Sequence, residues 1–183
     1  HVGDVVDTNA SEVQWAFARE TMDRLHGSGL PYGMSVGNHD MTSSGDSSNF
    51  QAAFPASRFA QESWYAGSFR NNANSCQLFS ACGLDFVVLH LECNAPDDAL
   101  AWADGMLQRF RSRRALITTH MGLGPLSPPA NVLEPSGRMR WKKCHDDAGN
   151  TPQEMWEKCF RKHENLVLVC SGDQSNSQAL RLA

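Results

Sequence analysis

The sequence predicts an α/β domain with a largely parallel β-sheet. Short apolar runs, of the length typical of buried strands, alternate along the chain with longer segments in which apolar residues recur at helical spacing. Polar residues follow directly after several of these runs, as they do on the loops beyond the strand ends of parallel sheets. With 183 residues, of which 41% are hydrophobic, the chain can form one sizeable core, so residues 1–183 are interpreted as a single domain.

Three segments predict amphipathic helices. In the first, Ser11 and Gln14 have the spacing of a capping box, which marks the start of a helix. In the last, Thr151 stands at the N-cap position and Pro152 at the first helical position, and Glu154 completes a second capping box. The predicted helices cover residues 11–25, 99–110 and 151–163.

Apolar runs predict the strands. The segment CQLFSACGLDFVVLHLE reads as two strands joined near Cys82 and Gly83, and its second half hardly alternates, so that strand is expected to be buried on both faces. The other predicted strands are residues 32–37, 114–120 and 165–172, and the first residues resemble the end of a further strand. Residues 41–74 and 121–150 show little periodicity and are expected to be irregular segments around a functional site.

Composition argues against several classes of function. The net charge of −4, with 16 basic and 20 acidic residues, does not favour nucleic-acid binding. No run approaches the roughly 20 apolar residues that span a bilayer. The six cysteines include no CxxC pair, so no structural zinc site is predicted. Cys76 and Cys82 could form a disulfide across a hairpin or remain thiols, and the sequence leaves both alternatives open, as it does the oligomeric state.

Four polar clusters each follow an apolar run. They contain, in chain order, Asp4; Asn38, His39 and Asp40; His120; and Asp173. Because the carboxyl ends of parallel strands meet at one edge of a sheet, these side chains are expected to lie together. Mixed oxygen and nitrogen donors suit divalent or trivalent metal ions, and a pair of ions can bind a phosphate and activate a water. The neutral oxygen of Asn38 would leave positive charge for an anionic substrate.

The ordered motifs GD, GNHD and TTH resemble those of the calcineurin-like metallophosphoesterase family, which includes the purple acid phosphatases. The resemblance implies that Asp4 bridges two metal ions and that Asn38 and His120 bind the second ion. It also implies that His39 protonates the leaving group and that Asp40 orients the His39 ring. The implied fold is a four-layer αββα sandwich of mixed β-sheets flanked by helices. The implied activity is hydrolysis of a small phosphate ester, with iron, zinc or manganese as the ions.

The sequence departs from the family pattern at two places. The family's Asp-x-His motif, which precedes GD, has no counterpart after His1, so the chain is interpreted as an amino-terminally truncated piece that is weakly active or inert alone. The family's Gly-His-x-His motif is replaced by GDQS, in which Asp173 could bind the second ion but Ser175 is a poor ligand for the first. The alternative is therefore a degenerate family member that binds a phosphorylated ligand without cleaving it.

Each candidate residue also has a purely structural explanation. Asp4 and Asp7 could cap the helix that follows, and for Asp7 capping is the preferred interpretation. Asn38, Asp40 and Asp173 could form turns, and His120 could be a hydrogen-bonded core histidine. His90, His145 and His163 are interpreted as structural. A basic run could bind an anion or form a solvated face; its members are Arg138, Arg140, Lys142 and Lys143.

Overall fold

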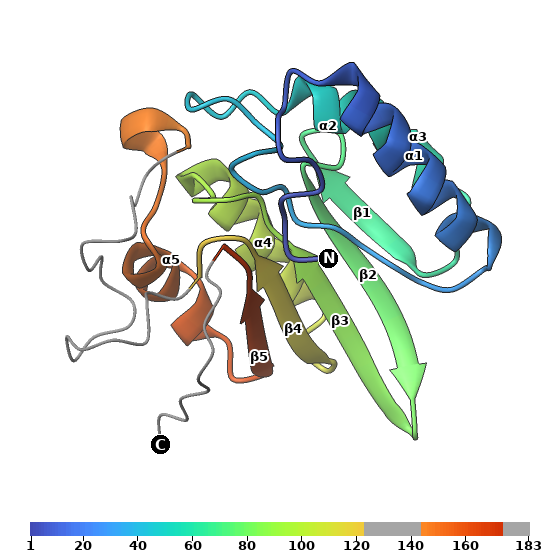
Figure 1. Ribbon diagram of the computed structural model, residues 1–183. Helices are drawn as coiled ribbons and strands as arrows, with labels where there is room; N and C mark the ends of the chain where they lie inside the picture. Colours follow the sequence, from blue (N-terminus) through green and yellow to red (C-terminus); the bar gives the residue numbers. More distant parts are fainter. Residues whose placement is uncertain (123–143, 174–183) are drawn as a thin grey trace, which may run out of the picture.

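The computed structural model describes residues 1–122 and 144–173 and has a mixed α/β architecture (Figure 1). One five-stranded sheet has the order β1-β2-β3-β4-β5. Its strands are β1 (Tyr65–Phe69), β2 (Asn74–Ala81), β3 (Leu84–His90), β4 (Arg114–Thr119) and β5 (Leu166–Ser171). The β1–β2 and β2–β3 pairs are antiparallel, whereas the β3–β4 and β4–β5 pairs are parallel. The α/β prediction is therefore confirmed, but a largely parallel sheet is correct only for the half from β3 to β5.

The helices begin where the capping signals predict. Ser11 is the N-cap of the first helix and accepts a hydrogen bond from the backbone of Gln14. Thr151 and Glu154 form a complete capping box at the start of α5, with Pro152 in its first turn. The helices are α1 (Glu12–Gly27), α2 (Ser48–Ala53), α3 (Ala56–Phe59), α4 (Asp97–Arg109) and α5 (Pro152–Lys158), with 3-10 turns η1 (Asp146–Ala148) and η2 (Phe160–Lys162). Within the described ranges, no helix is long and apolar enough to cross a membrane.

The two faces of the sheet differ in how they are covered. On one face, Val87 and Leu89 of β3 and Ile117 of β4 are fully buried in a cluster shared with α4 and α5. On the opposite face, Phe79 of β2 remains 36% exposed and Leu168 of β5 remains 50% exposed. A second core cluster joins α1, α2 and α3 to the segment before the GNHD motif, at the β1 side of the sheet (Figure 1).

The hairpin between β2 and β3 follows the sequence prediction. Cys82 (φ 52°) and Gly83 (φ 75°) both have positive φ, and they connect the paired residues Ala81 and Leu84. Two central residues of positive φ are typical of the tight turn that matches the twist of paired strands. The expectation that β3 is buried on both faces is wrong for its first two residues, which are exposed.

Residues 32–37 do not form the predicted strand. Ser35 donates a backbone hydrogen bond to His1 (3.0 Å), and Cys93 donates one to Val36 (2.8 Å). These bonds do not make a continuous ladder, so the segment is buried without being a regular strand, and residues 1–7 form none either. The prediction that residues 41–74 are irregular is also wrong, because α2, α3 and β1 lie there.

Candidate functional site

Three of the predicted site residues meet around the ring of His120. The Nε2 atom of His120 lies 3.1 Å from Oδ2 of Asp4 and 3.6 Å from Oδ1 of Asp173. These residues come from three distant parts of the chain: Asp4 precedes α1, His120 follows β4 and Asp173 follows β5. The side chains of His120 and Asp173 are 3% and 11% exposed, and that of Asp4 is 31% exposed. The site is therefore a partly open pair of carboxylates around a buried imidazole.

The backbone on both sides of Asn38 lies against Asp4. The N–H of His39 donates to Oδ1 of Asp4 (3.0 Å). A Cβ atom on Gly37 would lie 2.1 Å from the backbone nitrogen of Asp4, so only glycine permits this approach. The Oδ1 atom of Asn38 is buried and has no hydrogen-bond partner among the described residues. A buried acceptor of this kind is costly unless something outside the chain, such as a cation, binds it.

The ring of His120 is oriented as metal-binding histidines are. Its Nδ1 atom donates to the carbonyl oxygen of Val2 (2.8 Å), which directs Nε2 toward the carboxylates. Among the described residues, neither carboxylate contact gives Nε2 the geometry of a hydrogen bond. A histidine that binds a metal through one nitrogen commonly donates its other N–H to a carbonyl or carboxylate. The donor types and orientation therefore fit a metal ion.

The electrostatics of the site favour positive charge at Nε2. Burial would lower the pKa of His120, but Asp173 and Asp4, together with the Val2 carbonyl, raise that pKa to about 10. Burial also acts to raise the pKa of Asp4, yet the nearby His120 and the His39 N–H leave it below its ordinary value. In the ion-free chain the imidazolium supplies the positive charge. The same oxygens would stabilise a metal cation in its place.

Asp40 does not orient the His39 ring, which corrects the role expected from the resemblance. Asp40 is fully buried, and its carboxylate accepts hydrogen bonds from the backbone N–H groups of Gly37 (2.7 Å) and Val6 (3.0 Å). Burial raises the pKa of Asp40, and these two N–H groups oppose the rise. Asp40 therefore fixes the GNHD loop against residues 4–6, because both of its oxygens are used on the backbone.

Asp7, rather than Asp40, lies beside the His39 ring. Nδ1 of His39 lies 2.6 Å from the carbonyl oxygen of Asp7 and 3.9 Å from its carboxylate. Capping, the expected role of Asp7, belongs to Ser11. The His39 side chain is 45% exposed, so it can reach a ligand from solvent while the Asp7 backbone holds its ring.

A second group of potential metal ligands was not identified from the sequence. Asp104 of α4, Cys159 at the end of α5 and His163 after η2 have ligand atoms within 4.8 Å of one another. Nε2 of His163 lies 3.0 Å from Oδ1 of Asp104, and burial raises the pKa of the Cys159 thiol to about 12. The sequence signal was the Cys-x-x-x-His spacing; the contribution of Asp104 depends on how α4 packs.

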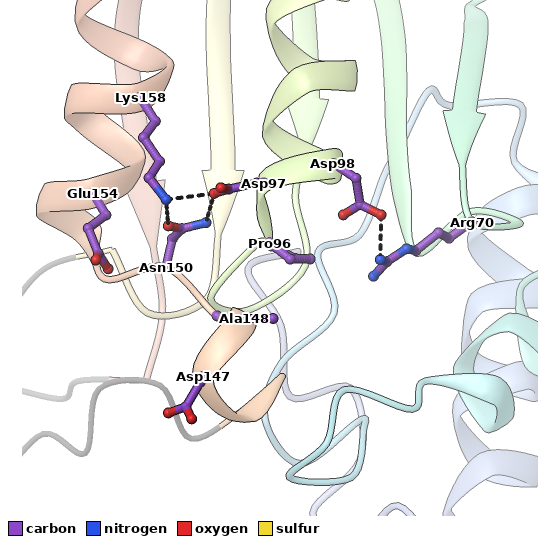
Figure 2. A pocket seen from close by; sticks show the side chains of 10 residues that line it. Arg70, Pro96, Asp97, Asp98, Asp147, Ala148, Asn150, Glu154 and Lys158 are labelled. Carbon is purple, nitrogen blue, oxygen red and sulfur yellow. Dashed lines mark hydrogen bonds and ion pairs between the residues drawn. The ribbon is translucent and has the colours of Figure 1, made fainter.

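The pocket in Figure 2 lies between the start of α4 and α5, with a volume of about 410 Å³. Lys158 contacts Asp97 and Asn150, each at 2.7 Å, and Arg70 contacts Asp98 at 2.7 Å. Four of its charged side chains thus form two ion pairs, Lys158 with Asp97 and Arg70 with Asp98. Of the remaining predicted residues, Gln174, Ser175 and the basic run at 138–143 lie outside the described residues.

Comparison with known proteins gives one relative of undetermined function. The chain is 35% identical over 121 residues to the protein described as "Uncharacterized protein YvnB" of Bacillus subtilis (strain 168). That similarity covers 66% of this chain but only 9% of the Bacillus protein. No family model matches the chain. No solved structure matches it either.

Proposed function

We propose that the protein is a metal-dependent phosphoric ester hydrolase of the calcineurin-like metallophosphoesterase family. The observation that carries the proposal is the meeting of Asp4, His120 and Asp173, with the backbone on both sides of Asn38 against Asp4. The buried Asn38 oxygen lacks a hydrogen-bond partner among the described residues, and Nε2 of His120 faces the carboxylates of Asp4 and Asp173. Polar atoms buried in this way are typical of ligands whose ion is not part of the chain.

The roles of the residues follow from their positions. Asp4, with its partly exposed carboxylate, would be shared between two ions, and Asn38, His120 and Asp173 would hold the second. Ions of the iron, zinc or manganese class would polarise a phosphate and activate a water for attack on phosphorus. His39 lies at the exposed rim, where its ring, held by the Asp7 carbonyl, would donate a proton to the leaving oxygen.

The finer fold that we propose is the four-layer αββα sandwich of that family. The incompletely covered face of the sheet supports it, because Phe79, Leu84 and Leu168 leave apolar surface there. Residues near Ser35 lie over the same face, where the Ser35 hydroxyl contacts Thr118 of β4 (2.7 Å). A second sheet would bury this apolar surface.

Metal binding is the first test. We expect the chain to be stabilised by manganese or zinc ions, and the His120→Gln variant to lose that response while remaining folded. In the protein as its gene encodes it, His39→Ala should strongly reduce turnover of an aryl phosphate and leave the metal content unchanged. Undiminished turnover in His39→Ala would contradict the role of His39, and the absence of any ion would contradict the hydrolase.

The second candidate is a degenerate family member that binds a phosphate ester without cleaving it. It is favoured by the replacement of two family histidines by Asp173 and Ser175. Elemental analysis separates the candidates. Two tightly held ions per chain support the enzyme, whereas no ion with retained binding of a phosphate ester supports the binding protein.

A further inference from the structure

Two buried cysteines, Cys93 and Cys144, lie against each other although they are far apart in the sequence. Cys93 follows β3 and is 0% exposed; Cys144 precedes η1 and is 1% exposed. Both belong to the same core cluster, and the Cys144 thiol, together with burial, raises the pKa of the Cys93 thiol, as a close neighbour does. In the structure both are thiols.

Contacts on both sides of this pair hold the two segments together. Asn150 donates its backbone N–H to the carbonyl of Asn94 (3.1 Å), and the Asn94 side chain donates to the carbonyl of Asn150 (3.1 Å). Directly next to the two cysteines, Oε2 of the fully buried Glu92, which precedes Cys93, lies 3.3 Å from Nε2 of His145, which follows Cys144. Neighbours of both cysteines are thus anchored to each other, which restrains the thiols as close neighbours.

We propose that Cys93 and Cys144 form a disulfide bond in the mature protein. In the reaction, one thiolate attacks a small-molecule disulfide such as oxidised glutathione and releases one reduced thiol. The second cysteine then attacks the mixed disulfide, forms the Cys93–Cys144 bond and releases the second small-molecule thiol. The two cysteines lose two protons and two electrons, and the external disulfide gains them. Because both sulfurs are buried in the folded chain, oxidation precedes the packing of residues 144–150.

The other cysteines are placed differently. Cys76 and Cys159 are buried in the cluster under α4 and α5, and burial raises the pKa of each thiol to about 12. Cys82 is exposed at the β2–β3 turn, and Cys170 of β5 is partly buried. The Cys76–Cys82 bridge considered from the sequence is therefore not the pair that the structure brings together.

The bond would brace the candidate site. The Cys93 backbone N–H donates to Val36 (2.8 Å), immediately before the GNHD loop. On the other side, Asp146 donates to the Ser43 carbonyl (3.4 Å), just after that loop. A Cys93–Cys144 bond joins these two contacts covalently and fixes both sides of the loop that carries Asn38.

The test is to refold the chain in a glutathione redox buffer, block free thiols under denaturing conditions and identify cross-linked peptides by mass spectrometry. We expect a Cys93–Cys144 peptide in the wild type and in the matched control Cys82→Ser. Cys93→Ser and Cys144→Ser should each lack it and show the remaining partner blocked as a free thiol.

Stability provides an independent measurement that does not require the serine variants to fold. A reductant should lower the thermal midpoint of the oxidised wild type and of Cys82→Ser. It should not lower that of Cys144→Ala. Folded wild type with all six thiols blocked, or with a different cysteine pair cross-linked, would overturn the proposal.

Discussion

Replacing Asn38 with leucine should change stability in opposite directions with and without metal. In the ion-free chain, the buried Asn38 oxygen has no partner among the described residues, and such an acceptor costs roughly 1–3 kcal/mol. Leucine has a similar size and removes the acceptor, so Asn38→Leu should be as stable as the wild type or more stable, by about 1 kcal/mol. A metal at about 100 times its dissociation constant stabilises a folded chain by about 2.7 kcal/mol, and the variant should lose that gain.

Asn72 is the matched control, because its side-chain amide is buried and satisfied. Its Oδ1 accepts from the Tyr65 hydroxyl (2.9 Å), and its Nδ2 donates to the Phe54 carbonyl (2.9 Å). Asn72→Leu leaves both partners without a hydrogen bond and places a leucine at a positive φ (77°), so it should cost at least roughly 1–3 kcal/mol with or without metal. Urea unfolding of the three chains, with chelator and with excess manganese, measures these differences.

The reasoning would be refuted by either of two results. If Asn38→Leu is destabilised in chelator as much as Asn72→Leu, the Asn38 oxygen has a partner within the folded chain. If Asn38→Leu keeps the full metal response, the oxygen does not bind the ion. Because the two results concern different states of the chain, each can be obtained independently of the other.

Three further predictions concern the surroundings of the site and the core. Burial lowers the pKa of His90 to about 3, so below pH ~6.5 the unfolded chain binds a proton there that the folded chain does not. The free energy of unfolding should therefore fall by up to about 1.4 kcal/mol for each pH unit as the pH drops from about 6.5 to about 3. The same pH dependence in His90→Gln would count against this. Gly37→Ala should displace Asp4 and abolish stabilisation by metal, because its Cβ would lie 2.1 Å from the Asp4 nitrogen. Gly27→Ala is the control: its Cβ would have nothing within 4 Å, so stabilisation by metal should be unchanged. Equal stabilisation of the two variants would contradict the steric argument. Leu107 is a fully buried residue of α4, and Leu107→Ala should cost roughly 2–5 kcal/mol in urea unfolding; a loss below 1 kcal/mol would show that the cluster repacks.

Local signals predicted much of the fold. Ser11 and Thr151 were recognised as helix caps because a side-chain oxygen three residues before a backbone N–H can bond to it whatever the rest of the chain does. The turn at Cys82 and Gly83 was recognised because apolar strand patterns flank it on both sides. Such features depend on a few neighbouring residues, so the sequence alone is sufficient for them.

Features that depend on distant contacts were predicted less well. Residues 32–37 have the apolar run of a strand, but their isolated bonds to His1 and Cys93 do not make a ladder. Asp40 was expected beside the His39 ring because the two are adjacent in sequence. Its oxygens instead bond to Gly37 and Val6, and only the fold brings Val6 there. Similarly, nothing local places Cys144 against Cys93.

The glycines that precede the candidate residues also indicate that the motifs lie close together in the fold. A Cβ on Gly3 would lie 2.6 Å from Nδ1 of His120, and one on Gly172 would lie 2.8 Å from the Val2 carbonyl. With Gly37 against Asp4, three glycines that each precede a candidate residue allow the backbones to meet at one point. A turn-forming glycine needs only its own φ angle. Gly37 and Gly172 are required by contacts with distant segments, and Gly3 is required by such a contact as well as by its positive φ (95°). The short motifs GD, GN and GD therefore indicate a common site.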